Sequence, residues 1–165
     1  MTEAYRVGDE LPPLEIPVTR TLIVAGAIAS RDYQDVHHDA ELAREKGSPD
    51  IFMNILTTNG LVGRYITDHF GSAAVLRKVA IRLGAPNYPG DVLRLTGRIV
   101  ALGDVALGDV ALEDVALEGE NRSLIEVAVT GDNRIGRHVT GKVTVAIPRA
   151  IPGAVTVAIT ERGGA

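Results

Sequence analysis

The chain has 165 residues, no cysteine and a formal net charge of −4. This length predicts one domain with a substantial core, and the absence of cysteine excludes disulfides and cysteine-based nucleophiles or metal sites. Basic and acidic residues are interspersed, so nucleic acid is not an expected partner. The acidic first residues and the short apolar runs predict neither a signal peptide nor contact with a membrane, and we expect a cytoplasmic protein.

The N-terminal segment predicts an extended arm. Pro12 and Pro13 exclude regular helix there, so residues 1–14 are assigned to the arm. Residues 15–18 then form a short extended piece, and Pro17 places that piece at the edge of a sheet.

Two short helices are expected next. The apolar run over residues 22–29 is rich in alanine, which favours a helix over a buried strand, and either Thr19 or Thr21 can cap it. Asp39 can cap a second, polar helix over residues 40–46.

The strongest helix pattern covers residues 51–70. Its apolar residues recur mostly at the three- and four-residue spacing of one helix face. Two glycines, Gly60 and Gly63, interrupt the pattern, and inside a helix each costs about 1 kcal/mol relative to alanine. We therefore expect both glycines to pack closely against a neighbouring element.

After Gly71 the pattern changes to the alternation of apolar and polar residues that is typical of strands. Four segments alternate in this way: 74–83, 91–100, 123–130 and 138–147. The expected fold class is therefore α+β, with an antiparallel sheet and the long helix on one of its faces.

A five-residue repeat of the type Val-Ala-Leu-Gly-Asp runs through residues 100–119. A period of five matches neither a helix nor a strand. We interpret the repeat as an expanded hairpin loop between two strands, with a lid or a partner-docking arm as the alternative. Residues 143–147 recur at 155–159, so residues 148–165 are expected to form a loose tail or one extra edge strand.

Residues 30–39 concentrate three carboxylates and two imidazoles. Asp32 and His37 are five residues apart, and a turn could bring both side chains to one point. A water held between a carboxylate and an imidazole can add to a polarised double bond, because the imidazole titrates near neutral pH and the carboxylate orients or accepts a proton. The alternative from spacing alone is that Asp32 caps a turn and His37 lies at the surface.

The same stretch resembles the signature of the MaoC-like (R)-specific enoyl-CoA hydratases, which runs Gly-Asp-x-Asn-Pro-Leu-His. Residues 31–37 keep the Asp and the His at the family spacing, but Arg31 stands where the family has Gly. The likeness continues in Gly-Leu-Val-Gly-Arg at 60–64 and in the turn at 84–91, which resembles the family's Ala-Pro-x-Tyr-Pro-Gly-Asp. It covers residues 15–147, apart from the repeat.

This resemblance implies a single hot-dog domain over residues 15–147, in which an antiparallel sheet wraps a long central helix. It also implies that Asp32 and His37 are catalytic and that no cofactor or metal is needed. The family's oxyanion hole is a backbone N–H at the start of the central helix. The matching positions here are Asn54 and Ile55, and Asn54 stands where the family usually has His.

Other residues are weaker candidates for the site. Tyr88 and Pro89 could border an acyl pocket, although packing within the turn is the simpler explanation. Arg31 and Arg64 could meet the phosphates of a CoA, but single arginines are usually surface charges. The remaining histidines, for which solvated or structural roles are expected, are His38, His69 and His138.

The expected function is the hydration of a trans-2-enoyl-CoA thioester. Residues 35–39 and 50–57 resemble the small catalytic subunit of the steroid side-chain enoyl-CoA hydratases. That likeness implies a steroid-CoA substrate and a second hot-dog chain as partner, with a homodimer as the alternative. Two other functions stay open: a (3R)-hydroxyacyl dehydratase that acts on an acyl carrier protein thioester, and a non-catalytic subunit that shapes a partner's acyl tunnel.

Overall fold

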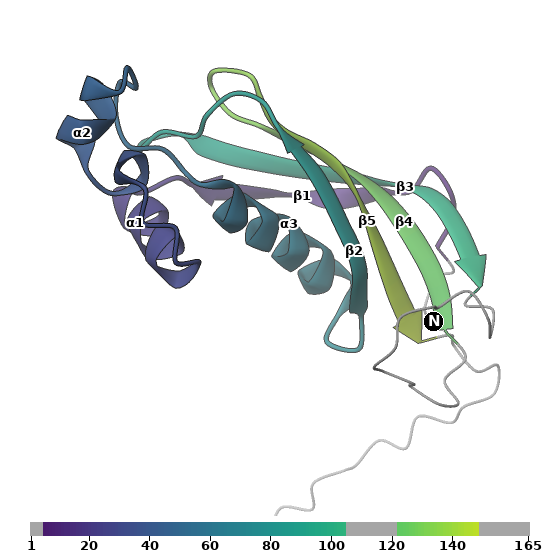
Figure 1. Ribbon diagram of the computed structural model, residues 1–165. Helices are drawn as coiled ribbons and strands as arrows, with labels where there is room; N and C mark the ends of the chain where they lie inside the picture. The colour runs from purple at the N-terminus through teal and green to yellow at the C-terminus, as the bar shows by residue number, and fades with distance from the viewer. Residues whose placement is uncertain (1–4, 105–121, 149–165) are drawn as a thin grey trace, which may run out of the picture.

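The computed structural model describes residues 5–104 and 122–148. In this part of the chain five strands form one antiparallel sheet in the order β1-β3-β4-β5-β2. The strands are β1 (Glu10–Pro17), β2 (Val75–Leu83), β3 (Val92–Asp104), β4 (Arg122–Asp132) and β5 (Arg137–Pro148). The helices are α1 (Arg20–Ala29), α2 (Ala40–Glu45), α3 (Ile55–Phe70) and the short 3-10 helix η1 (Asp35–His37). The long helix α3 lies along one face of the sheet, and α1 and α2 lie beyond its N-terminal end (Figure 1).

The core lies between α3 and the face of the sheet that it covers. Along β4, Ile125, Val127 and Val129 are buried and alternate with more exposed residues, as the period of two in a strand requires. From α3, Val62 and Ile66 meet this surface and are fully buried. The α+β class and the helix on one face of the sheet are therefore as the sequence predicts.

The long helix begins later than expected, at Ile55 rather than at residue 51. Asn54 forms its N-cap, because the side-chain oxygen accepts a hydrogen bond from the Thr57 N–H. Just before the cap, the N–H groups of Phe52 and Met53 donate to carbonyl groups of two other segments instead of joining a helix. The apolar residues ahead of Asn54 thus belong to a non-helical segment of the core.

The first strand begins earlier than expected, at Glu10, so that residues 10–14 lie in the sheet and not in an arm. The register of β1 against β3 shifts between Leu11 and Leu14, where Pro12 and Pro13 lie. A proline cannot donate a ladder hydrogen bond, and the irregular register accommodates two in succession. β1 is an edge strand, which confirms the prediction made from Pro17.

The predicted caps of the two short helices are confirmed. Thr19 rather than Thr21 caps α1, since its hydroxyl accepts from the Leu22 N–H, and Asp39 caps α2. β3 and β4, which flank the repeat, pair with each other. Most of the repeat and residues 149–165 lie outside the described residues. None of the described helices is long and apolar enough to cross a membrane.

Only one of the two glycines in the long helix has the close packing that was expected of both. A Cβ built at Gly63 would lie 3.2 Å from Leu76, so this glycine does pack closely, but a Cβ at Gly60 meets no atom within 4 Å. The tightest helix contact involves Gly26 of α1, where a Cβ would lie 2.1 Å from Thr57 Oγ1. Gly26 therefore allows α1 to approach the first turn of α3.

Two glycine-to-alanine substitutions should change stability in opposite directions. Gly60→Ala should raise the free energy of unfolding by about 1 kcal/mol, because alanine favours the helix and its methyl group meets open space. Gly26→Ala should lower it by about 1–3 kcal/mol, because the added methyl group overlaps Thr57. Denaturant unfolding of both variants measures the two changes. Equal effects would contradict the close approach of α1 and α3.

Candidate active site

Asp32 is presented by the turn that ends α1. The Arg31 N–H donates to the carbonyl of Ile28 and the Asp32 N–H to that of Ala27, which is the Schellman arrangement at a helix end. Arg31 holds the left-handed position of this motif with φ of 56°, where glycine is usual. A non-glycine residue pays about 1–2 kcal/mol for this conformation. The turn nevertheless forms, and it presents Asp32 at the end of α1.

His37 is held in one orientation and one tautomer. Its ring is buried, 6% exposed, and packs edge-on against Phe52 with the centroids 5.0 Å apart. Nδ1 lies 2.7 Å from the carbonyl oxygen of Phe52. A carbonyl can only accept, so Nδ1 carries the hydrogen, and in the neutral imidazole Nε2 presents a lone pair.

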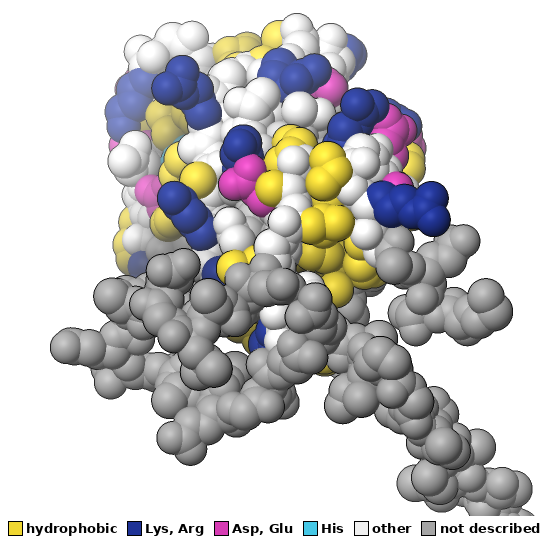
Figure 2. Space-filling model, turned by 90° about the vertical axis from the view of Figure 1, so that its right-hand side faces the viewer, with side chains coloured by type: hydrophobic (Ala, Val, Ile, Leu, Met, Phe, Trp, Pro, Cys, Tyr) yellow, Lys and Arg dark blue, Asp and Glu magenta, His cyan; other side chains and the backbone are white. Residues whose placement is uncertain are grey.

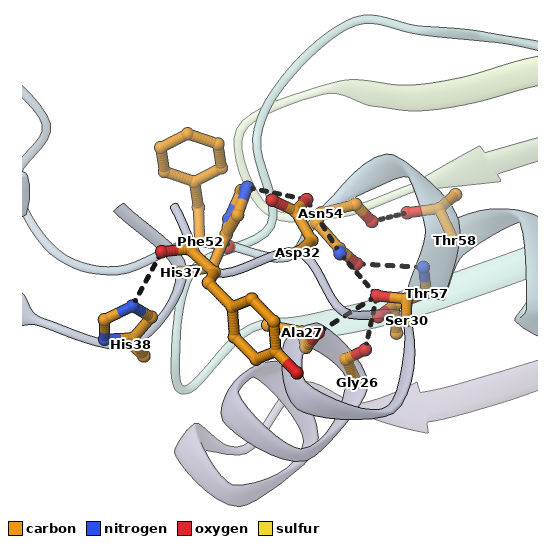
Figure 3. A network of polar contacts seen from close by, with 11 residues as sticks. Gly26, Ala27, Ser30, Asp32, His37, His38, Phe52, Asn54, Thr57 and Thr58 are labelled. Atoms are coloured by element: carbon orange, nitrogen blue, oxygen red, sulfur yellow. Dashed lines mark hydrogen bonds and ion pairs between the residues drawn. The ribbon is translucent and has the colours of Figure 1, made fainter. Parts of the chain in front are cut away.

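That lone pair faces the carboxylate of Asp32. Nε2 of His37 and Oδ2 of Asp32 are 3.4 Å apart, and the Asp32 side chain is 18% exposed (Figure 3). The distance is longer than an ordinary hydrogen bond. Two acceptors that face each other in this way need a shared proton, or a water that donates to both. The structure thus brings together the Asp and the His that the sequence singled out.

Asn54 connects Asp32 to the start of α3. Its Nδ2 donates to Asp32 Oδ2 at 3.0 Å and to Ser30 Oγ at 2.9 Å, while its Oδ1 accepts from the Thr57 N–H at 2.9 Å (Figure 3). The backbone donor fixes which end of the amide is oxygen. Asn54 is 2% exposed and uses both ends of its amide. Its side-chain amide is therefore fully occupied by protein partners, one of which is Asp32, and its role in binding a substrate stays a prediction.

Ser30 completes this network on the side of α1. Its hydroxyl donates to the carbonyl of Gly26 at 2.7 Å and accepts from Asn54 Nδ2. Because the end of α1 and the N-cap of α3 are joined through this hydroxyl, Asp32 cannot move independently of α3. Nothing in the spacing of the sequence identified Ser30.

The first turn of α3 presents backbone N–H groups next to this network. The first N–H groups of a helix have no partner within the helix. Asn54 satisfies that of Thr57, and the N–H groups of Ile55 and Leu56 have no acceptor among the described residues. The side chains of Ile55 and Leu56 are half exposed. Within the described part of the chain, the predicted oxyanion donor, the N–H of Ile55, is thus unpaired, and it directly follows Asn54, which bonds to Asp32.

A second buried imidazole supports the same turn of α3. His138 is 1% exposed; its Nδ1 donates to the carbonyl of Ala85 at 2.7 Å, and its Nε2 accepts from the Thr58 hydroxyl at 2.9 Å. Burial lowers the pKa of His138, and the hydrogen bond to Ala85 opposes this only in part. No local pattern predicts this role, because Ala85, Thr58 and His138 are far apart in the chain.

The weaker candidates lie at different distances from the pair. Tyr88 packs edge-on against Phe52 at 6.3 Å between centroids, so it reaches His37 only through that ring, and Pro89 beside it is half-buried.

His38 is exposed and bonds to the Tyr33 carbonyl. Among the remaining candidates, His69 packs on aromatic rings at the far end of α3, and Arg64 pairs with Asp68 of its own helix.

Replacing Asn54 should separate its two roles. Asn54→Ala removes the helix cap and the donor to Asp32, and should lower the free energy of unfolding by about 1 kcal/mol or more. Asn54→Ser keeps a capping oxygen but loses the donor, so it should be the more stable variant of the two. Thermal and denaturant unfolding check the order. If serine and alanine destabilise equally, the cap contributes nothing.

The chain is similar to proteins of one family. A family model described as a MaoC like domain matches residues 4–118. A relative from Mycobacterium tuberculosis (strain ATCC 25618 / H37Rv), named 3-oxo-4,17-pregnadiene-20-carboxyl-CoA hydratase beta subunit, is 47% identical over 98 residues, which are 59% of this chain and 76% of that protein.

Solved structures agree on the fold. A chain in the crystal structure of the ChsH1-ChsH2 complex from Mycobacterium tuberculosis superposes with a TM-score of 0.71 and 39% identity, over 89% of this chain and 99% of that one. The (R)-hydratase from A. caviae involved in PHA biosynthesis gives a TM-score of 0.70 at 17% identity, over 89% and 100%, and this likeness concerns the fold alone. The predicted hot-dog fold is thus confirmed. Since the family model matches more than half of the residues, this chain belongs to the family of MaoC-like domains.

Proposed function

We propose that this chain hydrates trans-2-enoyl-CoA thioesters and that Asp32 and His37 hold the attacking water. The observation that carries the proposal is the 3.4 Å separation between His37 Nε2 and Asp32 Oδ2. Because His37 gives its Nδ1 hydrogen to Phe52, both facing atoms are acceptors, and one water can donate a hydrogen to each. The lone pairs of that water oxygen then remain available for an electrophilic carbon.

The proton transfers of the addition need only this pair. The water oxygen bonds to the β carbon while one of its protons passes to the Asp32 and His37 pair. The electrons of the carbon–carbon double bond move toward the thioester, whose oxygen gains negative charge. A proton returned from the pair to the α carbon completes the hydration, so the pair is unchanged after each turnover.

The start of α3 supports the charge that develops on the thioester oxygen. The N–H of Ile55 is unpaired among the described residues, and the N-terminal end of a helix carries partial positive charge. A preorganised donor of this kind acts on the intermediate more strongly than on the substrate. Asn54 contacts both Asp32 and this helix start, which supports a fixed spacing between the water and the oxyanion donor.

The expectation of an enzyme of the hydro-lyase class is confirmed by the family and by the name of the Mycobacterium tuberculosis relative. We assign a bulky steroid side-chain CoA as the substrate on the likeness to that relative. A second hot-dog chain as partner is supported by the likeness to a chain of a solved complex. It is also supported by the exposure of Ile55 (48%) and Leu56 (50%), since an acyl tunnel at the start of α3 needs both covered.

The catalytic assignment predicts a large loss of activity in two variants. Asp32→Asn and His37→Ala should each lower the rate of hydration by roughly 10²-fold or more, because each removes one acceptor for the water. Asp35→Asn and His38→Gln are the matched controls: Asp35 pairs with Lys46 and His38 is exposed, so both variants should hydrate at nearly the wild-type rate. Loss of the conjugated enoyl absorbance measures the rate.

A comparison of substrates in this assay distinguishes the proposed hydratase from the two alternative functions. A steroid enoyl-CoA, a short enoyl-CoA and an enoyl thioester of acyl carrier protein are compared, with the chain alone and with a co-purified partner. Faster turnover of the carrier-protein thioester would favour the dehydratase of fatty-acid elongation. Absence of hydration under every condition would leave the non-catalytic subunit, and near wild-type rates for Asp32→Asn or His37→Ala would refute the assigned roles.

The oxyanion donor can be removed without removing the helix. Proline is well accepted at the first position of a helix and has no N–H, and Asn54 before it already has the extended backbone that proline requires, with φ of −78° and ψ of 163°. Ile55→Pro should therefore keep the fold but lower kcat by roughly 10²–10³-fold. Ile55→Ala, which shortens the side chain and retains the N–H, is the control. Equal rates for the two variants would place the oxyanion elsewhere.

A further inference from the structure

The peptide group between Phe52 and Met53 makes two hydrogen bonds in opposite directions. Its carbonyl accepts the Nδ1 hydrogen of His37 at 2.7 Å, and its N–H donates to the backbone carbonyl of Asn87 at 3.0 Å. A peptide group is planar, so a rotation that breaks one of these bonds also misaligns the other. Each bond also polarises the peptide and strengthens its counterpart. The orientation of the imidazole therefore depends on where the carbonyl of Asn87 lies.

Asn87 lies in the turn between β2 and β3 and is fully buried. Its side-chain Oδ1 accepts a hydrogen bond of 2.7 Å from Nδ2 of Asn133, which lies in the turn between β4 and β5. The same Nδ2 donates to the carbonyl of Pro86 at 2.8 Å. The two turns lie side by side at the end of the sheet where α3 begins (Figure 1). Asn133 thus holds the turn to which the N–H of Met53 is bonded.

The backbone of its own turn fixes the amide of Asn133. Oδ1 accepts from the N–H of Ile135 at 2.9 Å and from that of Gly136 at 3.0 Å. An amide nitrogen can only donate, so the end of the amide that faces Asn87 carries the hydrogens. The side chain of Asn133 therefore connects the β4–β5 turn to the β2–β3 turn in one defined orientation.

This contact differs from the charged pairs on the surface. Figure 2 shows one side of the molecule on which Lys and Arg side chains lie beside Asp and Glu side chains. Exposed ion pairs, of which Arg98 with Glu10 is an example, contribute little because water competes for both charges. Asn87 is shielded from water, so loss of its partner would leave a buried polar atom unsatisfied. The contact between the two amides is therefore suited to hold a turn in place.

Loss of this support would affect the hydrogen on His37. If the Phe52 carbonyl no longer accepts it, the hydrogen can move to Nε2 and bond to Oδ2 of Asp32, which lies 3.4 Å away. Nε2 would then no longer accept a hydrogen from the attacking water. The tautomer that the Phe52 carbonyl selects is thus the one that the proposed addition requires.

We propose that Asn87 and Asn133 are positioning residues for His37, which act through the peptide between Phe52 and Met53 and keep the imidazole in the tautomer that accepts from water. The effect on rate rests on the proposed function, in which His37 takes part in the proton transfers. The effect on the imidazole is independent of that function, because it concerns a hydrogen atom in the free protein.

Asn133→Asp removes the donor and keeps the rest of its turn. A carboxylate still accepts from the N–H groups of Ile135 and Gly136, but it cannot donate to Asn87. The variant should lower kcat about tenfold or more with KM little changed, because a catalytic group is misplaced. Asn87→Ala removes the acceptor of the same contact and should act in the same direction. The double variant should lose less than the product of the two single losses, since both remove one contact.

The tautomer of His37 is measured directly by NMR of isotope-labelled histidine nitrogens at a pH at which the imidazole is neutral. The chain has 4 histidines, so the signals are few, and their loss in His37→Ala assigns those of His37. We expect the hydrogen on Nδ1 in the wild type, and a share of it on Nε2 in Asn133→Asp and in Asn87→Ala. This measurement needs no substrate.

Thr130→Val is the matched control. It removes a side-chain hydrogen bond of the same sheet, between the hydroxyls of Thr130 and Thr96 at 2.8 Å, and leaves the contact between Asn87 and Asn133 intact. Its kcat and its His37 signals should match those of the wild type. Circular dichroism establishes that each variant is folded.

Wild-type kcat and wild-type His37 signals in folded Asn133→Asp would overturn the proposal. So would equal changes in Thr130→Val, which would reflect a general loosening of the sheet. If Asn133→Asp does not fold, Asn87→Ala decides by the same two measurements. If the wild type hydrates no substrate, the proposed function fails, while the His37 signals still decide whether the two amides position the imidazole.

Discussion

The side-chain amide of Asn54 is the contact on which the geometry of the site depends. One end holds the carboxylate of Asp32 and the hydroxyl of Ser30, and the other caps α3. The proposed water site and the proposed oxyanion donor come from different helices, α1 and α3, and this amide sets their separation. Gly26 supports the same arrangement, because the absence of a side chain allows α1 to approach Thr57. A buried amide with both ends bonded has few alternative positions.

His37 is fixed by a separate set of contacts. The Phe52 carbonyl selects its tautomer, and the Phe52 ring packs against the imidazole. Phe52 lies in the non-helical segment just before the N-cap. The segment before α3 therefore orients the imidazole, while the first residue of α3 offers its N–H, so that both groups depend on where the helix begins.

Local signals in the sequence predict much of this fold, whereas contacts between residues distant in the chain could not be predicted from the sequence. Thr19 and Asp39 act within a few residues of the helices they cap, and strand alternation depends only on a period of two. The start of α3 was misplaced because Ile51 and Met53 continue the apolar pattern, although a non-helical segment supplies them to the core. The Asp32 and His37 pair was accessible from its spacing, whereas Ser30 and His138 act through partners distant in the chain. The resemblance to a family indicated the chemical role of the pair, because spacing alone left that role open.

The proposed mechanism requires one water that bridges Asp32 and His37. Neutron diffraction from deuterium-exchanged crystals of the 165-residue chain, grown with its partner where one co-purifies, can locate this water and its deuterium atoms. We expect deuterium on Nδ1 of His37 and none on Nε2, with a water that donates to both Nε2 of His37 and Oδ2 of Asp32. Deuterium on Nε2 bonded directly to the Asp32 carboxylate, with no water between them, would contradict it.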